Sequence, residues 1–301
     1  MMKIGIIGAG SIGLLFSYYL SEKNQVTIYT RSKRQAELIN LNGVCLMVDG
    51  TTKTVWVEAI PFELWTGSEE LTIITVKQYH LPTILPVLND RIKGWGSLLF
   101  LQNGMGHLKW LSELNAQRIY LGSVEHGAAR VNEYTVSHNG YGITKSAAYR
   151  GNEDYLEWLV SSTPANFPII LEGDYLPILQ KKLIVNCIIN PLTATFQVPN
   201  GTLVSNPYFY QIVISFFEEI VQILNIHNRE EQFANVISVC KKTSANHSSM
   251  LKDIVAGRET EIDAILGFVL EEAKRKQMQA PLTRNYYNLI KGKEYKEEDF
   301  R

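Results

Sequence analysis

The first half of the chain alternates short apolar runs with segments of helical spacing. Apolar, β-branched runs occupy residues 3–7, 26–30, 71–76, 97–101 and 119–123, and residues 12–20 between the first two have the spacing of a helix. The runs 71–76 and 97–101 are apolar almost throughout, which is typical of strands covered on both faces. The pattern predicts an α/β fold, a doubly wound parallel sheet of the Rossmann type.

The second half of the chain is predicted to be mostly α-helical. Segments 211–226, 230–243 and 260–277 carry apolar residues three and four positions apart. Before them, residues 125–149 indicate a few antiparallel strands that close the first domain, and Pro164, Pro168 and Gly173 then interrupt the pattern. We therefore expect two domains, residues 1–170 and 171–301, and a charged, solvated tail over residues 291–301.

Composition and charge argue against several classes of function. The 29 Lys and Arg residues balance 30 Asp and Glu, so no basic field exists for nucleic acid. No apolar run is long enough to cross a membrane, and the N-terminus lacks the features of a signal peptide. Cys45, Cys187 and Cys240 fit neither a disulfide framework nor a metal site and are expected to be buried thiols. We expect a cytoplasmic protein without a metal.

A glycine-rich motif directly follows the first predicted strand and opens the first predicted helix. Its residues are Gly8, Ala9, Gly10, Ser11, Ile12 and Gly13. Such a motif is a weak signal alone, but the strand–loop–helix context favours dinucleotide binding over an ordinary glycine turn. Gly8 would permit the tight turn, Gly10 would let the backbone approach the pyrophosphate, and Gly13 would allow close packing of helix on strand.

The end of the second predicted strand indicates which dinucleotide binds. NAD-binding folds place an acidic residue there for the ribose hydroxyl, whereas this chain has Arg31, Lys33 and Arg34. A 2′-phosphate suits Arg31, so NADP(H) is the expected cofactor, although an incidental basic turn would give the same pattern. Lys77, Gln78 and Asn103 follow the next two strands and are expected to border the nicotinamide, with turn formation as the alternative.

Polar residues recur every fourth position in the apolar stretch 180–192. Lys182, Asn186 and Asn190 would form one narrow stripe on a largely buried helix that Pro191 is expected to end. The stripe could be the solvent face, but its uncharged Asn residues favour a ligand cleft. In such a cleft the ammonium of Lys182 could stabilise and protonate a carbonyl oxygen that accepts negative charge.

These motifs together resemble the ketopantoate reductase family over essentially the whole chain. The resemblance includes the loop 8–13, Val76-Lys77, Gln102-Asn103-Gly104, the stretch 182–193, Pro199-Asn200-Gly201 and the residues from Ser248 through Asp263. It implies NADPH-dependent reduction of 2-dehydropantoate to (R)-pantoate, a step of pantothenate and coenzyme A biosynthesis, by a monomer or homodimer.

The same resemblance implies roles for individual residues. Lys182 would be the general acid, and Glu261 would hold the substrate hydroxyl and help to orient Lys182. Substrate contacts are implied for Asn103, Asn186, Asn190, Asn200 and Ser249. Spacing alone would read Glu261 as a surface helix residue. Two rival functions remain, a reductase of another small 2-keto acid and a non-catalytic NADP sensor.

Overall fold

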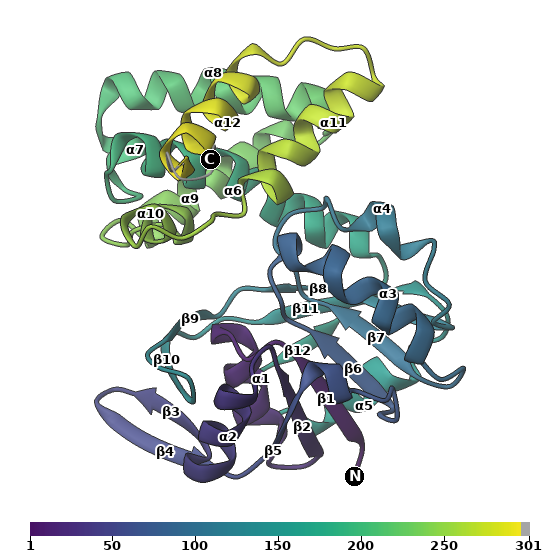
Figure 1. Ribbon diagram of the computed structural model, residues 1–301. Coiled ribbons are helices and arrows are strands. Elements are labelled where there is room, and N and C mark those ends of the chain that lie inside the picture. Colours follow the sequence, from purple (N-terminus) through teal and green to yellow (C-terminus); the bar gives the residue numbers. More distant parts are fainter. Residues whose placement is uncertain (296–301) are drawn as a thin grey trace. The chain divides into compact units, whose positions relative to one another are not determined.

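The computed structural model describes residues 1–295, which form two compact units (Figure 1). The first contains residues 1–102 and 109–178, and the second contains residues 103–108 and those from 179 onward. The division falls at 178/179 within helix α6 (Tyr175–Phe196), whereas the Pro and Gly positions had pointed to 170/171. Pro164 and Pro168 lie in the loop between α5 and β12, and Gly173 lies in the loop before α6, so all three precede the division within this helix.

A central eight-stranded sheet confirms the predicted Rossmann-type fold of the first unit. Its strand order is β12-β11-β8-β7-β6-β1-β2-β5. The six neighbouring strands from β8 to β5 in this order are parallel to one another, and β11 is antiparallel to β8. The direction of winding reverses between β1 and β6, where ligands of such sheets bind. The strands are β1 (Lys3–Ile7), β2 (Gln25–Thr30), β5 (Glu58–Pro61), β6 (Leu71–Ile74), β7 (Ser97–Phe100), β8 (Arg118–Val124), β11 (Thr144–Arg150) and β12 (Ile169–Leu171).

A second, four-stranded sheet packs on the other side of helix α1 (Ser11–Leu20), which contacts both sheets. Its order is β4-β3-β10-β9, with β3 (Val44–Val48), β4 (Thr51–Val55), β9 (Gly127–Arg130) and β10 (Thr135–Gly140). Residues 125–149 form antiparallel strands as predicted, since β9 pairs with β10 in this sheet and β11 pairs with β8 in the main sheet. The hairpin β3–β4 was missed, although Asp49 and Gly50, with φ of 47° and 77°, form its two-residue turn.

The remaining elements of the first unit are short helices around the main sheet (Figure 1). They are α2 (Lys33–Asn42), η1 (Phe62–Leu64), η2 (Gln78–His80), α3 (Leu81–Arg91), α4 (Leu108–Leu111) and α5 (Asp154–Ser162).

An aromatic cluster fills the space beside α1. The ring of Phe167 stacks on those of Tyr19 and His126, each at 4.4 Å between centroids. The Tyr19 hydroxyl lies 2.9 Å from Nδ1 of His138, whose Nε2 lies 3.2 Å from Nδ1 of His126. This cluster joins α1 to residues of β10 and of the loops beside β9 and β12, and it excludes water from both histidines.

The second unit is helical, as predicted. It comprises α6, α7 (Thr202–Ser205), α8 (Pro207–Leu224), α9 (Arg229–Lys242), α10 (Ser249–Val255), η3 (Asp263–Gly267), α11 (Phe268–Arg275) and α12 (Pro281–Glu294). The element η3 is a π-helical turn that leads directly into α11. None of the helices within residues 1–295 combines the length and apolar character that a membrane span requires.

Three predictions from the sequence need correction. Pro191 does not end α6, which continues to Phe196 because its apolar face remains buried beyond the proline, at Leu192 and Ala194. Residues 291–294 are not a solvated tail but the last turn of α12; residues 296–301 of that predicted tail lie outside the described residues. Cys45 is only half-buried and lies 3.3 Å from the Thr54 hydroxyl.

Candidate active site

The glycine motif forms a turn between β1 and α1 in which two glycines are structurally required. Gly8 has a φ of +111°, and a Cβ at Gly13 would lie 1.7 Å from the carbonyl oxygen of Gly8. A side chain at position 13 would therefore push α1 away from the end of β1. These are the turn and the close packing that the sequence predicted.

Gly10 has no structural requirement of this kind, because a Cβ there would meet nothing within 4 Å. It is also the N-cap residue of α1, and no side chain caps this helix. The first turn therefore presents backbone N–H groups and the positive end of the helix dipole. The open space at Gly10 and these N–H donors fit the pyrophosphate of a dinucleotide.

Two side chains that no sequence pattern pointed to hold this loop, the buried Gln35 and the half-buried Thr75. The amide of Gln35 donates to the carbonyl oxygens of Ala9 at 2.9 Å and Glu133 at 2.8 Å. The hydroxyl of Thr75, just beyond β6, donates to the carbonyl oxygen of Gly8 at 2.8 Å. Their sequence positions, inside a helix and at a strand end, carry no signal for this role.

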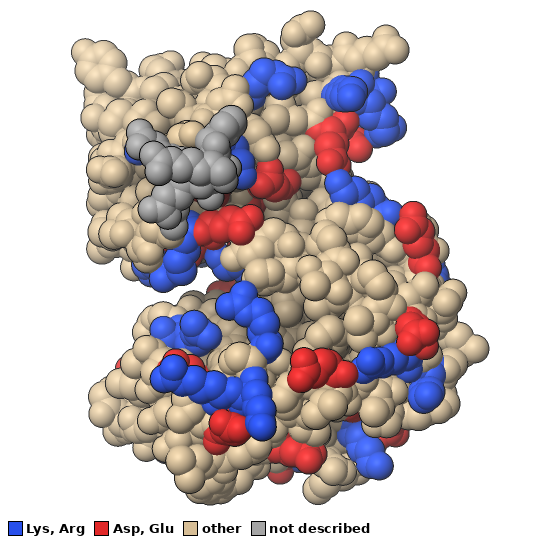
Figure 2. All heavy atoms as spheres, in the orientation of Figure 1, with Lys and Arg blue, Asp and Glu red and all other residues tan. Residues whose placement is uncertain are grey.

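Basic side chains meet near the ends of β2 and β6. Arg31 follows β2 and Lys77 follows β6, and both lower the pKa of His80, although burial of this imidazole is the larger cause. Arg31, Lys33 and Arg34 are exposed, and Lys33 lies 3.8 Å from Glu37. Basic side chains gather on the part of the first unit that carries α1 and α2 (Figure 2). The region is suited to an anionic group.

The loop after β6 also holds Gln78, which is buried in η2. Beside this loop, the amide of Gln102 donates to the carbonyl oxygens of Ile74 at 3.0 Å and Val76 at 2.9 Å. Gln102 thereby fixes the exit of β6 that precedes Lys77. From the sequence, Gln102 is recognisable only as part of the family motif Gln102-Asn103-Gly104.

In the second unit, α6 carries the predicted polar stripe on an otherwise apolar helix. Lys182 and Asn186 are half-buried and Asn190 is 7% exposed, whereas Leu183, Ile184, Cys187, Ile188 and Ile189 are all buried. An exposed solvent face would not bury Asn190. The stripe is therefore not an ordinary solvent face.

Asn103 and Glu261 come together within the second unit. The amide of Asn103 donates to a carboxylate oxygen of Glu261 at 2.8 Å. The approach depends on Gly104, which has a φ of +76° and whose Cβ would lie 2.1 Å from the carbonyl oxygen of Ala264. The backbone N–H of Met105 donates to that same oxygen at 3.3 Å. Glu261 is thus a half-buried carboxylate and not the exposed helix residue that spacing alone suggested.

Asn200 and Ser249 differ in their surroundings from the other predicted substrate contacts. Asn200 is buried, and its amide donates to the Thr243 hydroxyl at 2.9 Å, so it ties the turn before α7 to the end of α9. Ser249 is exposed at the first position of α10. Its neighbour Ser248 caps α10 through the Leu251 N–H and lies 2.7 Å from the Thr193 hydroxyl of α6.

The fold and these residues define a two-unit α/β protein with a dinucleotide-binding turn and a helical unit that carries a lysine–asparagine stripe. Family models for ketopantoate reductase PanE/ApbA and for its C-terminal domain match residues 4–151 and 174–294. The chain belongs to the ketopantoate reductase family.

Individual relatives extend over the whole chain. A 2-dehydropantoate 2-reductase of Listeria innocua is 40% identical over 97% of both chains. The crystal structure of a probable 2-dehydropantoate 2-reductase of Bacillus subtilis is 40% identical, with a TM-score of 0.90 over 97% of this chain and 100% of the other. A D-mandelate dehydrogenase, solved with NADH and anilino(oxo)acetate, has a TM-score of 0.88 over 97% and 98% of the two chains, and at 21% identity this likeness shows the shared fold.

Proposed function

We propose that this protein reduces 2-dehydropantoate to (R)-pantoate with NADPH, a step of pantothenate and coenzyme A biosynthesis. The observation that carries the proposal is the full-length match to 2-dehydropantoate 2-reductases. The paired Asn103 and Glu261 and the polar stripe of α6 supply the polar groups that a small keto acid with a hydroxyl requires.

The first unit supports binding of a nicotinamide dinucleotide. The N–H groups at the start of α1 and the space at Gly10 suit its pyrophosphate. Arg31 is proposed to contact the 2′-phosphate, while Lys77 and Gln78 lie beyond the carboxyl end of the next strand and are proposed to border the nicotinamide. Bound NADPH supplies a hydride to the ketone carbon.

The second unit supports proton transfer and substrate orientation. Lys182 is proposed to donate a hydrogen bond to the ketone oxygen, to stabilise its developing negative charge and to protonate it. Glu261 is proposed to accept a hydrogen bond from the substrate hydroxyl, while Asn103 holds the Glu261 carboxylate. Asn186 and Asn190 are proposed to donate to the substrate.

A substrate panel tests the proposal. Purified protein is assayed with NADPH and, separately, 2-dehydropantoate, pyruvate and phenylglyoxylate, the 2-keto acid that corresponds to mandelate. We expect kcat/KM for 2-dehydropantoate to exceed the others by at least about a hundredfold, because only this substrate offers Glu261 a hydroxyl at the matching position. A higher kcat/KM with another 2-keto acid would favour the rival reductase, and absence of turnover with all three would favour the NADP sensor.

A further inference from the structure

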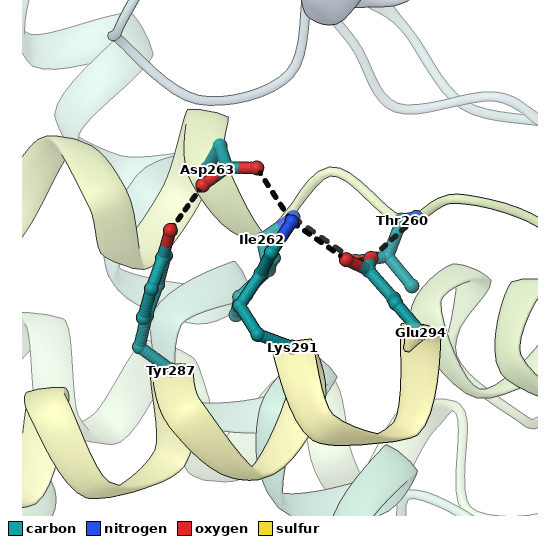
Figure 3. A network of polar contacts seen from close by, with 6 residues as sticks. All are labelled: Thr260, Ile262, Asp263, Tyr287, Lys291 and Glu294. Atoms are coloured by element: carbon teal, nitrogen blue, oxygen red, sulfur yellow. Dashed lines mark hydrogen bonds and ion pairs between the residues drawn. The ribbon is translucent and has the colours of Figure 1, made fainter. Parts of the chain in front are cut away.

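The last helix of the second unit contacts the short segment that carries Glu261. Tyr287, Lys291 and Glu294 are four and three positions apart on α12, so their side chains share one face of the helix. Figure 3 shows these side chains directed toward Thr260 and Asp263, which lie on either side of Glu261. The four residues from 260 to 263 are thus connected to α12 rather than forming a free loop.

Thr260 is almost fully buried, at 1% exposed. Its backbone N–H and its hydroxyl both donate to the same carboxylate oxygen of Glu294, at 2.8 and 2.5 Å. The Thr260 hydroxyl in turn accepts the backbone N–H of Ile262 at 3.2 Å. The residues immediately before and after Glu261 are therefore fixed by one hydroxyl and one carboxylate.

Asp263 provides the second attachment. Its carboxylate accepts the Tyr287 hydroxyl at 2.5 Å and lies 3.2 Å from Nζ of Lys291, which also lies 2.9 Å from Glu294. Burial lowers the pKa of Lys291, but its contacts with Glu294 and Asp263 outweigh this and raise the pKa overall, so the amine stays charged. The cation balances two carboxylates beside Glu261.

We propose that Thr260, held by Glu294, is a positioning residue that fixes the carboxylate of Glu261 for its substrate contact. The inference rests on the proposed function of Glu261. The carbonyl oxygen of Glu261 accepts the Ile265 N–H at 3.1 Å and its carboxylate accepts Asn103, so with both neighbours fixed the side chain has little freedom to move. Small displacements of a substrate-orienting group reduce catalysis strongly.

A double-mutant cycle separates positioning from a role in stability alone. Thr260→Val removes the hydroxyl but keeps the shape of the side chain, and it is combined with Glu261→Ala. At a temperature well below unfolding, we expect Thr260→Val to lower kcat/KM for 2-dehydropantoate about tenfold without changing the Kd of NADPH. In the Glu261→Ala background, the same change should alter kcat/KM by less than about twofold, because the group that Thr260 positions is gone.

Further variants serve as rescue and control. Thr260→Ser keeps the hydroxyl and should restore most of the activity. If Thr260→Val folds poorly, Glu294→Gln replaces it in the same cycle. The control is Glu272→Gln, which removes a comparable ion pair with Arg275, 2.6 Å long, from α11 and should leave kcat/KM unchanged.

The outcomes distinguish the inference from the function on which it rests. An equal loss of kcat/KM from Thr260→Val in both backgrounds, or no loss in either, would overturn the positioning role. A Glu261→Ala protein with unchanged kcat/KM would overturn the proposed role of Glu261, and the inference with it.

Discussion

At the scale of single residues, Lys182 is a half-buried lysine on a helix whose other faces are mostly apolar. Lys182 is half-buried on α6, next to the buried Leu183 and Ile184. Burial of an ammonium costs free energy unless polar partners are present, so such a residue is a candidate for chemistry. The asparagines one and two turns further along extend the polar surface.

Replacement of Lys182 tests its proposed role as general acid. We expect Lys182→Ala to lower kcat by at least about a thousandfold, because both proton transfer and stabilisation of the oxygen are lost. The Kd of NADPH should remain within about threefold of the wild-type value, since the change removes a transition-state contact. Stopped-flow turnover and fluorescence titration of NADPH measure the two effects, and an unchanged kcat would end the assignment. Lys181→Ala, at the exposed neighbouring position, is the matched control.

Arg31 is the residue that should decide between NADPH and NADH. A guanidinium pairs with a 2′-phosphate through two hydrogen bonds, which NADH cannot form. We expect Arg31→Ala to raise the Kd of NADPH at least about tenfold and to change that of NADH less than about twofold. Equal weakening of both nucleotides in binding titrations would show that Arg31 does not contact the phosphate. Arg34→Ala, also exposed, shows how much general basic charge contributes.

At the scale of elements, the turn between β1 and α1 contains two glycines that the fold requires and one that it does not. All three belong to one sequence motif, but only Gly8 and Gly13 are constrained by the protein itself. At Gly10 the space beside the backbone is open, and the proposed dinucleotide would occupy it. The motif therefore contains glycines required by the backbone and a glycine beside open space, and the sequence alone does not distinguish the two kinds.

A pair of alanine variants tests this separation. Gly13→Ala should destabilise the protein by about 3 kcal/mol or more, because its Cβ meets a backbone oxygen. Gly10→Ala should change the free energy of unfolding by less than about 1 kcal/mol, yet raise the Kd of NADPH at least about tenfold. Urea unfolding and nucleotide titration of both variants give the answer. Normal NADPH binding by Gly10→Ala would show that the dinucleotide does not approach this position.

Most of the elements that carry the candidate site could be predicted from the sequence. The strands β1, β2, β6, β7 and β8 and the helix α6 have continuous apolar patterns, and buried elements of this kind are the easiest to recognise. The pairing of β10 with β3 could not be predicted, because it joins residues distant in sequence and no local pattern encodes it. The hydrogen bond between Asn103 and Glu261 could not be predicted either, because 158 positions separate the two residues.

At the scale of the whole molecule, buried histidines make folding sensitive to acid, and His126 and His138 of the aromatic cluster are two of them. Burial is the larger cause, and proximity to His138 the smaller, of the lowering of the pKa of His126 to about 4. Burial also lowers the pKa of His138, although a backbone hydrogen bond with Gly140 opposes this. In the unfolded chain a histidine takes up a proton near pH 6.5. The contribution of His126 to stability is thus complete above about pH 6.5 and is lost as the pH falls toward 4, and that of His138 changes in the same direction.

The pH dependence of unfolding tests this conclusion. For each histidine that stays neutral in the folded state, the free energy of unfolding falls by up to about 1.4 kcal/mol for each pH unit below 6.5. We expect His126→Gln to flatten this dependence between pH 6.5 and 4.5, measured by urea unfolding at several pH values. His227→Gln, at an exposed position, should keep the wild-type slope. Parallel curves for wild type and His126→Gln would contradict the prediction.

The assignment of residues 103–108 to the second unit affects how members of this family can exchange parts. A chimera that joined residues 1–178 of one member to the remainder of another would take Asn103 and Gly104 from one parent, and Glu261 and Ala264 from the other. Recombination at a single junction therefore cannot transfer the helical unit intact. Exchange of the helical unit must therefore include residues 103–108. Otherwise the two parents must already have the same residues at 103, 104, 261 and 264.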